Sequence, residues 1–128
     1  MFKRIDHSEA IASDIDRTIK FYTEVLGFTI IERMAVDAPP IKEIAFLKLG
    51  DTMMELIGVT DPAPCPANPF YVGYRGIAIE VENMDECVAY LNCKNVAITW
   101  GPVSLGSSIR AEICDPDGLI IELRQWGV

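Results

Sequence analysis

The chain has 128 residues, half of them apolar, and its 19 acidic and 11 basic side chains give a net charge of −8. This length and composition predict one globular domain with a packed core rather than a disordered chain. The acidic charge argues against nucleic acid and membrane surfaces as partners, because it repels their phosphate groups.

The N-terminal half has the pattern of a strand, a helix and three further strands. Residues 1–7 lack the apolar stretch of a secretory signal, and no apolar run reaches the roughly 20 residues of a membrane span, so a cytoplasmic protein is predicted. Residues 5–13 are strand-like, and a helix of about three turns follows, with Asp14 and Asp16 as capping residues and Gly27 at its end. Later strands are predicted over residues 28–36, 44–49 and 53–57.

The C-terminal half repeats this order after a proline-rich linker, residues 59–73. The predicted elements are a strand, a helix and three strands, over residues 74–82, 84–94, 96–100, 108–114 and 119–124. The sequence therefore predicts an α+β fold of two tandem βαβββ modules, residues 1–58 and 74–128, within one domain. Because each module covers only one sheet face with its own helix, the other faces are expected to enclose a cleft.

The four cysteines, Cys65, Cys87, Cys93 and Cys114, have no C-x-x-C spacing, and the chain has a single histidine, His7. Neither a zinc ribbon nor a thioredoxin-like site is indicated. Reduced, mostly buried thiols are predicted.

Four short stretches are together typical of one protein family, because their order and spacing are specific although each stretch alone is weak: Ile5-Asp6-His7, Leu26-Gly27-Phe28, Asp115-Pro116-Asp117-Gly118 and Ile121-Glu122-Leu123. Over essentially the whole chain they resemble the glyoxalase/bleomycin-resistance/extradiol-dioxygenase superfamily, also called the vicinal oxygen chelate fold. The resemblance implies a curved, partly open mixed sheet, formed by two βαβββ modules around a divalent metal. It also implies a homodimer that binds a small molecule.

Metal ligands in such proteins come from the first and fourth strand of each module, which here implies His7, Glu55, Gly76 and Glu122. Gly76 stands where typical members carry histidine, and it cannot bind a metal. The implied ligand set is therefore His7, Glu55 and Glu122. One imidazole and two carboxylates suit nickel, zinc, manganese, iron or cobalt.

The two carboxylates of this set have a structural alternative. Glu55 and Glu122 could face solvent, or pair with Lys48 or Arg124. Their apolar sequence neighbours favour a metal partner, because burial of an unpaired carboxylate is costly.

Strand alternation adds further residues to the candidate site. A strand that turns His7 into the cleft also turns Glu9 and Ile11 that way. Glu9 could replace the missing histidine as a ligand, or act as a general base. The predicted substrate cleft comprises Ile11, Tyr74, Gly76 and Trp100.

The resemblance implies a metal-dependent lyase or isomerase similar to glyoxalase I, which moves a proton next to a carbonyl, with Glu122, Glu55 or Glu9 as the base. Members that use glutathione carry arginine and asparagine where this chain has Ile11 and Val59. A small substrate that is not bound to glutathione is therefore predicted. Three alternatives stay open: a metal-free binding protein like the antibiotic-sequestering members, an extradiol dioxygenase, and a coenzyme A thioester epimerase.

Overall fold

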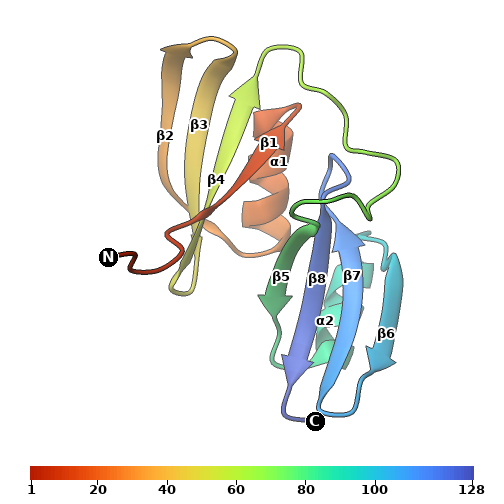
Figure 1. Ribbon diagram of the computed structural model, residues 1–128. Helices are drawn as coiled ribbons and strands as arrows, with labels where there is room; N and C mark the ends of the chain where they lie inside the picture. Colours follow the sequence, from red (N-terminus) through yellow and green to blue (C-terminus); the bar gives the residue numbers. More distant parts are fainter. The chain divides into compact units, whose positions relative to one another are not determined.

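The computed structural model describes all 128 residues, and the chain divides into two compact units, Met1–Pro64 (unit 1) and Cys65–Val128 (unit 2). Each unit holds one four-stranded sheet with a helix against it (Figure 1). The predicted order βαβββ is confirmed in both units. None of the helices has the length and apolar character that crossing a lipid bilayer requires.

Unit 1 is a mixed sheet in the order β1-β4-β3-β2, in which β1 runs parallel to β4 and the other pairs are antiparallel. Alternation along the central strands buries Leu47 and Leu56 completely, while Phe46 and Glu55 on the other face stay partly exposed. The open face of this sheet is therefore the one that carries Glu55. The elements are β1 (Ser8–Ala12), α1 (Ile15–Lys20), the π-helical turn η1 (Phe21–Val25), β2 (Thr29–Ala38), β3 (Ile41–Leu49) and β4 (Thr52–Val59).

Unit 2 repeats this topology in the order β5-β8-β7-β6, again with its first and last strands parallel. Ile113 and Leu123 are buried on the sheet face that packs against α2, whose Leu91 is also buried. Glu112 and Glu122 alternate with these residues and lie on the opposite face. The elements are β5 (Gly76–Glu80), α2 (Met84–Cys93), β6 (Trp100–Ser104), β7 (Ser108–Cys114) and β8 (Ile120–Trp126).

Both α-helices begin at a side-chain cap. The carboxylate of Asp14 accepts a hydrogen bond from the backbone N–H of Arg17 at 3.1 Å, as the acidic N-terminus of this helix predicted. The amide oxygen of Asn83 accepts one from the backbone N–H of Glu86 at 3.0 Å. Gly27 ends the first helical segment with a φ of 80°, a left-handed conformation that glycine tolerates because it has no side chain.

Replacing Asn83 with alanine is expected to lower the free energy of unfolding by about 1 kcal/mol, because a first-turn N–H loses its acceptor. Urea denaturation measures this change. Asn92, exposed within α2, provides the matched control, and Asn92→Ala should cost nothing because alanine favours helix. Equal losses in both variants would contradict the assigned cap.

The strand predicted over residues 96–100 is wrong, since β6 begins only at Trp100. The segment before it completes the end of α2. The backbone N–H of Val96 donates to the carbonyl of Leu91 at 2.9 Å, and Asn95 takes a φ of 58°. This helix-capping geometry keeps residues 96–98 out of the sheet, and the first contact with β7 is the hydrogen bond from the backbone N–H of Thr99 to the carbonyl of Glu112 at 2.8 Å.

The prediction that most cysteine side chains are buried is also wrong. All four thiols are free, Cys65 and Cys93 are exposed, and Cys87 and Cys114 are partly exposed. The apolar neighbours of these residues in sequence do not predict burial, because the exposed ones lie in the linker and at the last turn of α2.

Candidate functional site

The first candidate site lies in unit 1, where β1 runs beside β4. The register of this parallel pair places Glu9 opposite Glu55. His7 directly precedes β1, and its Nε2 lies 3.1 Å from Oε2 of Glu55 and 3.4 Å from Oε1 of Glu9. The structure thus brings together three residues that the sequence had singled out.

The imidazole of His7 is held from two further sides. Its Nδ1 lies 2.8 Å from the carboxylate of Asp6, and the ring meets Phe46 edge-on, with 5.5 Å between centroids. The hydrogen bond to Asp6, then that to Glu9 and the charge of Glu55, raise the pKa of His7 above its ordinary value. A carboxylate on one ring nitrogen orients the other nitrogen, here toward Glu9 and Glu55.

This donor set fits a divalent metal ion. The nitrogen of His7 and the carboxylate oxygens of Glu9 and Glu55 all lie within 4.8 Å of one another. Ligand atoms around one such ion are separated by about 3–3.5 Å, given metal–ligand distances of about 2.1 Å. The separations of 3.1 and 3.4 Å from His7 match that spacing.

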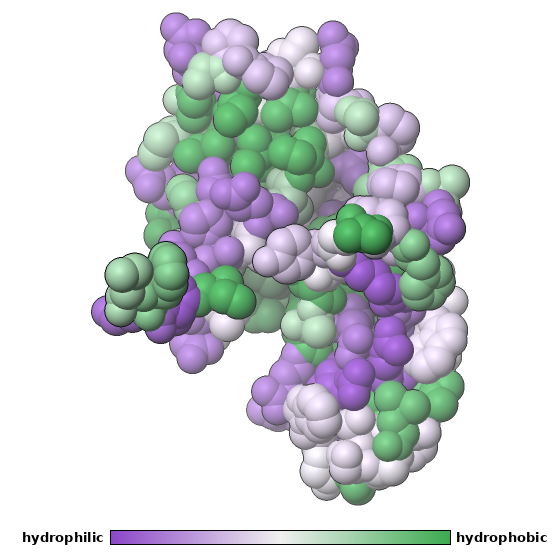
Figure 2. Space-filling view, in the orientation of Figure 1, coloured by the Kyte–Doolittle hydropathy of each residue, from purple (hydrophilic) through white to green (hydrophobic).

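An apolar row borders the cluster on the same open face of unit 1. Ile11 lies opposite Ile57, which pairs with Ile44, which pairs with Met34. Ile11, a predicted cleft residue two positions from Glu9, is 51% exposed. Figure 2 shows apolar side chains gathered over this sheet. A ligand bound at the cluster would therefore contact apolar rather than charged side chains beside Glu9.

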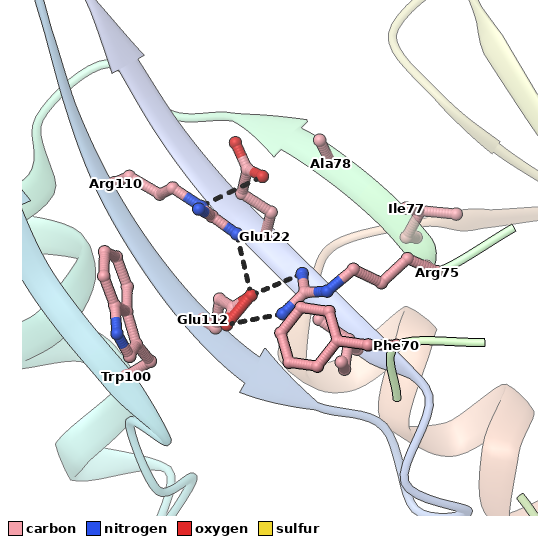
Figure 3. A pocket seen from close by; sticks show the side chains of 10 residues that line it. Phe70, Arg75, Ile77, Ala78, Trp100, Arg110, Glu112 and Glu122 are labelled. Atoms are coloured by element: carbon pink, nitrogen blue, oxygen red, sulfur yellow. Dashed lines mark hydrogen bonds and ion pairs between the residues drawn. The ribbon is translucent and has the colours of Figure 1, made fainter. Parts of the chain in front are cut away.

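The second candidate site is a cavity of about 550 Å³ on the open sheet face of unit 2 (Figure 3). The predicted residues Gly76, Trp100 and Glu122 line it. Tyr74 does not line it. The strand predicted from residue 74 begins only at Gly76, so alternation does not extend to Tyr74, which is 92% exposed.

The polar lining of this cavity is a chain of ion pairs. Arg75 contacts Glu112 at 2.6 Å, and Glu112 also accepts from Arg110 at 2.9 Å. Glu122 lies 3.1 Å from Arg110 and 2.6 Å from Arg124. Arg124, a possible partner of Glu122 from the sequence, is thus observed, and Arg110 is a second partner that was not predicted. Hydrophilic side chains gather over the sheet of unit 2 (Figure 2).

Each arginine also lies over an aromatic ring. Arg110 lies 5.0 Å from the ring centre of Trp100, and Arg75 lies 5.2 Å from that of Phe70. Such stacking, together with a carboxylate partner, restricts the guanidinium to one orientation.

Three residues of this cavity, Arg75, Arg110 and Glu112, were not predicted from the sequence. Alternation along the predicted strand 108–114 would have placed Arg110 and Glu112 on one face. No local signal joins them to Arg75, which is 37 residues from Glu112 in the chain.

Replacing Glu112 with glutamine is expected to lower the free energy of unfolding by about 2 kcal/mol, because Arg75 and Arg110 lose a charged acceptor. Arg75 holds the pKa of Glu112 below its ordinary value of 4.5. The stabilisation is therefore complete above pH 4.5 and is lost as pH falls through the lower folded value.

Thermal unfolding at about pH 7 and about pH 3 measures both parts of this prediction. The variant should be less stable than the wild type at the higher pH, and the difference should shrink at the lower one. The exposed Glu82 provides the control, and Glu82→Gln should show neither effect. A difference that persists undiminished in acid would contradict the assigned charge pairing.

Known proteins are similar to this chain over nearly its whole length. The family described as Glyoxalase/Bleomycin resistance protein/Dioxygenase superfamily matches residues 4–123. A lactoylglutathione lyase of Arabidopsis thaliana is 33% identical over 129 residues, which cover 98% of this chain and 45% of that protein. The chain thus spans about half the length of that relative.

A bacterial relative has a length closer to that of this chain. A lactoylglutathione lyase of Salmonella typhimurium is 34% identical over 124 residues, covering 94% of this chain and 90% of the relative. The crystal structure of a glyoxalase family protein from Enterococcus faecalis is similar, with a TM-score of 0.84 and 29% identity. The match covers 96% of this chain and 98% of that one. The predicted α+β fold of two βαβββ modules is thereby confirmed.

Proposed function

This chain belongs to the glyoxalase/bleomycin resistance protein/dioxygenase superfamily, and from that premise we propose that it is a metal-dependent lyase or isomerase. The reaction moves a proton next to a carbonyl of a small substrate. The observation that carries this proposal is the cluster of one imidazole and two carboxylates in unit 1.

His7, Glu55 and Glu9 are the side chains that would hold the ion. Glu55 is the more buried carboxylate, with a side chain 13% exposed, and the Glu9 side chain is 61% exposed. Glu122, the third ligand predicted from the sequence, has both oxygens near guanidinium groups, so ligation through it would require breaking these ion pairs. The unit 1 donor set is therefore the preferred one.

A divalent ion bound here would polarise a carbonyl oxygen as a Lewis acid. The proton transfer is the task of the chain's own residues. We assign it to Glu9, because its Oε1 faces the ion site and the second oxygen of this exposed carboxylate can accept a proton from the hydroxyl-bearing carbon next to the carbonyl. Glu9 then delivers this proton to the former carbonyl carbon, while the hydroxyl proton passes to the former carbonyl oxygen. Glu55 and Glu122 are the alternative bases. Asp6 keeps the His7 imidazole in position throughout.

The substrate is proposed to be less charged than a glutathione adduct. Ile11 and Val59 stand where the resemblance implies the arginine and asparagine that hold glutathione. The apolar row next to Glu9 supports a substrate with a hydrocarbon substituent at this end.

The direct test uses the hemithioacetals that methylglyoxal forms with glutathione and with the small thiol 2-mercaptoethanol. We expect turnover that a chelator abolishes and added metal restores. The kcat/KM should be about tenfold higher for the small adduct, since Ile11 offers no partner to a glutathione carboxylate.

Two results would count against the proposal. Absence of metal-dependent turnover with either adduct would overturn the enzymatic function and favour a metal-free binding protein. Turnover with a preference for glutathione would overturn only the substrate assignment.

A further inference from the structure

The cavity of unit 2 has more hydrogen-bond donors than acceptors. Its polar lining consists of the guanidinium groups of Arg75 and Arg110 and the carboxylates of Glu112 and Glu122 (Figure 3). A guanidinium carries N–H groups on three nitrogens, and a carboxylate only accepts. The balance between them decides which ligand chemistry the cavity favours.

The acceptors are already engaged. One oxygen of Glu112 accepts from both Arg75 and Arg110, and its second oxygen lies 3.3 Å from Arg75. Glu122 receives two contacts from Arg124 through one oxygen. A ligand that offered hydrogen-bond donors would compete with these ion pairs.

Several donors are left over. Arg75 uses its two terminal nitrogens on Glu112, and its Nε has no contact within the network. Arg110 uses its Nη2 on Glu112, and its buried Nε lies 3.1 Å from Oε2 of Glu122, so its Nη1 has no contact within the network. A ligand oxygen that accepts from the Nε of Arg75 or the Nη1 of Arg110 would therefore form a charge-assisted hydrogen bond.

The shape of the cavity adds a second requirement. The rings of Phe70 and Trp100 form parts of its wall, and Gly76 and Ala78 line its β5 side. Flat aromatic groups pack well against such rings and against stacked guanidinium planes.

We propose that the unit 2 cavity binds a small aromatic carboxylate, whose oxygens accept hydrogen bonds from Arg75 and Arg110 while its ring packs against Trp100 and Phe70. This goes beyond the proposed function. The site consists of unit 2 residues alone and needs no metal.

Benzoate is the probe that tests this site, with benzamide and benzylamine as neutral and cationic compounds of similar size. Isothermal titration of the full chain, pretreated with chelator, should show benzoate binding about tenfold or more tightly than benzamide, because charge-assisted hydrogen bonds are stronger. Benzylamine should not bind. Because this titration is done without metal, a lack of benzoate binding would not contradict the proposed function. A lack of metal-dependent turnover would likewise not contradict benzoate binding.

The variant Arg75→Met should weaken benzoate binding by about tenfold or more, because a charged donor is lost while an apolar stem remains. Arg75→Lys, which keeps the charge but not the planar donors, should fall between this variant and the wild type. The matched control is Arg33→Met, since Arg33 is also shared between two carboxylates, Glu43 and Asp16, but lies in unit 1. It should bind benzoate as the wild type does.

Circular dichroism verifies that each variant is folded. The proposal is overturned if benzoate shows no binding at concentrations up to about 10 mM. Equal affinities for benzoate and benzamide would also overturn it, as would undiminished binding by both Arg75 variants.

Discussion

Replacing Glu55 with glutamine is expected to lower the affinity of the chain for a divalent metal ion by at least about 100-fold. The carboxylate of Glu55 is the most buried oxygen donor of the unit 1 cluster and lies 3.1 Å from Nε2 of His7. An amide carries no charge to balance the ion. Because loss of even an indirect partner of a ligand costs about 10–100-fold, loss of the ligand itself should cost more.

Elemental analysis and competition titration measure this effect. Glu32 provides the matched control, because it is an exposed carboxylate on the same sheet and pairs in register with Phe46. Glu32→Gln should retain the wild-type affinity, and Asp6→Asn, which loses the partner of His7, should lose about tenfold. Equal affinities of Glu55→Gln and Glu32→Gln would refute the site. So would a wild type that takes up none of nickel, zinc, manganese, iron or cobalt.

The variant Glu122→Gln decides between two ligand sets. A loss as large as that of Glu55→Gln would assign the third ligand to Glu122, as the sequence predicted. Retained affinity would assign it to Glu9, as the distances in unit 1 favour.

Replacing Gly76 with alanine is expected to lower the free energy of unfolding by about 3 kcal/mol. A Cβ at this position would lie 2.1 Å from the carbonyl oxygen of Ile120 on the neighbouring strand. Because the added Cβ would overlap this oxygen, the two strands would have to move apart locally, which disturbs the pairing of β5 with β8. The variant Gly76→His meets the same obstacle, so it should not gain metal affinity even though histidine is the residue typical of the family.

Gly58 is the matched control, since it is also a strand glycine. A Cβ there would have no neighbour closer than 3.6 Å, which is ordinary contact. Gly58→Ala should change the free energy of unfolding by less than about 1 kcal/mol. Denaturant titration of both variants makes the comparison. A Gly76→His variant with wild-type stability and tighter metal binding would contradict this explanation of the missing ligand.

The fold was largely predictable because its signals are local. The helix cap Asp14 accepts a hydrogen bond from a residue only three positions later, and Gly27 ends the helical segment through its own backbone conformation. Strand alternation likewise explains why Leu56 is buried while Glu55 lies on the open face of β4, although this was not predicted. The same logic failed over residues 96–100, because the end of α2 took the backbone N–H that a strand would have used.

The candidate site was predictable only in part. His7, Glu9 and Glu55 were named because strand alternation links the first two and the family resemblance links the third to them. Arg75 and Glu112 were not found, since their contact spans 37 residues and depends on where the loop before β5 runs.

By itself, the sequence determined the element order, the helix caps, the sheet faces and the absence of a ligand side chain at Gly76, because each follows from residues close together in the chain. Only the tertiary structure decided that Glu9 lies opposite Glu55, and that Glu122 pairs with arginines. The physical reason is that strand register and ion pairing join distant segments. Their energies depend on distances that exist only after the sheets have formed.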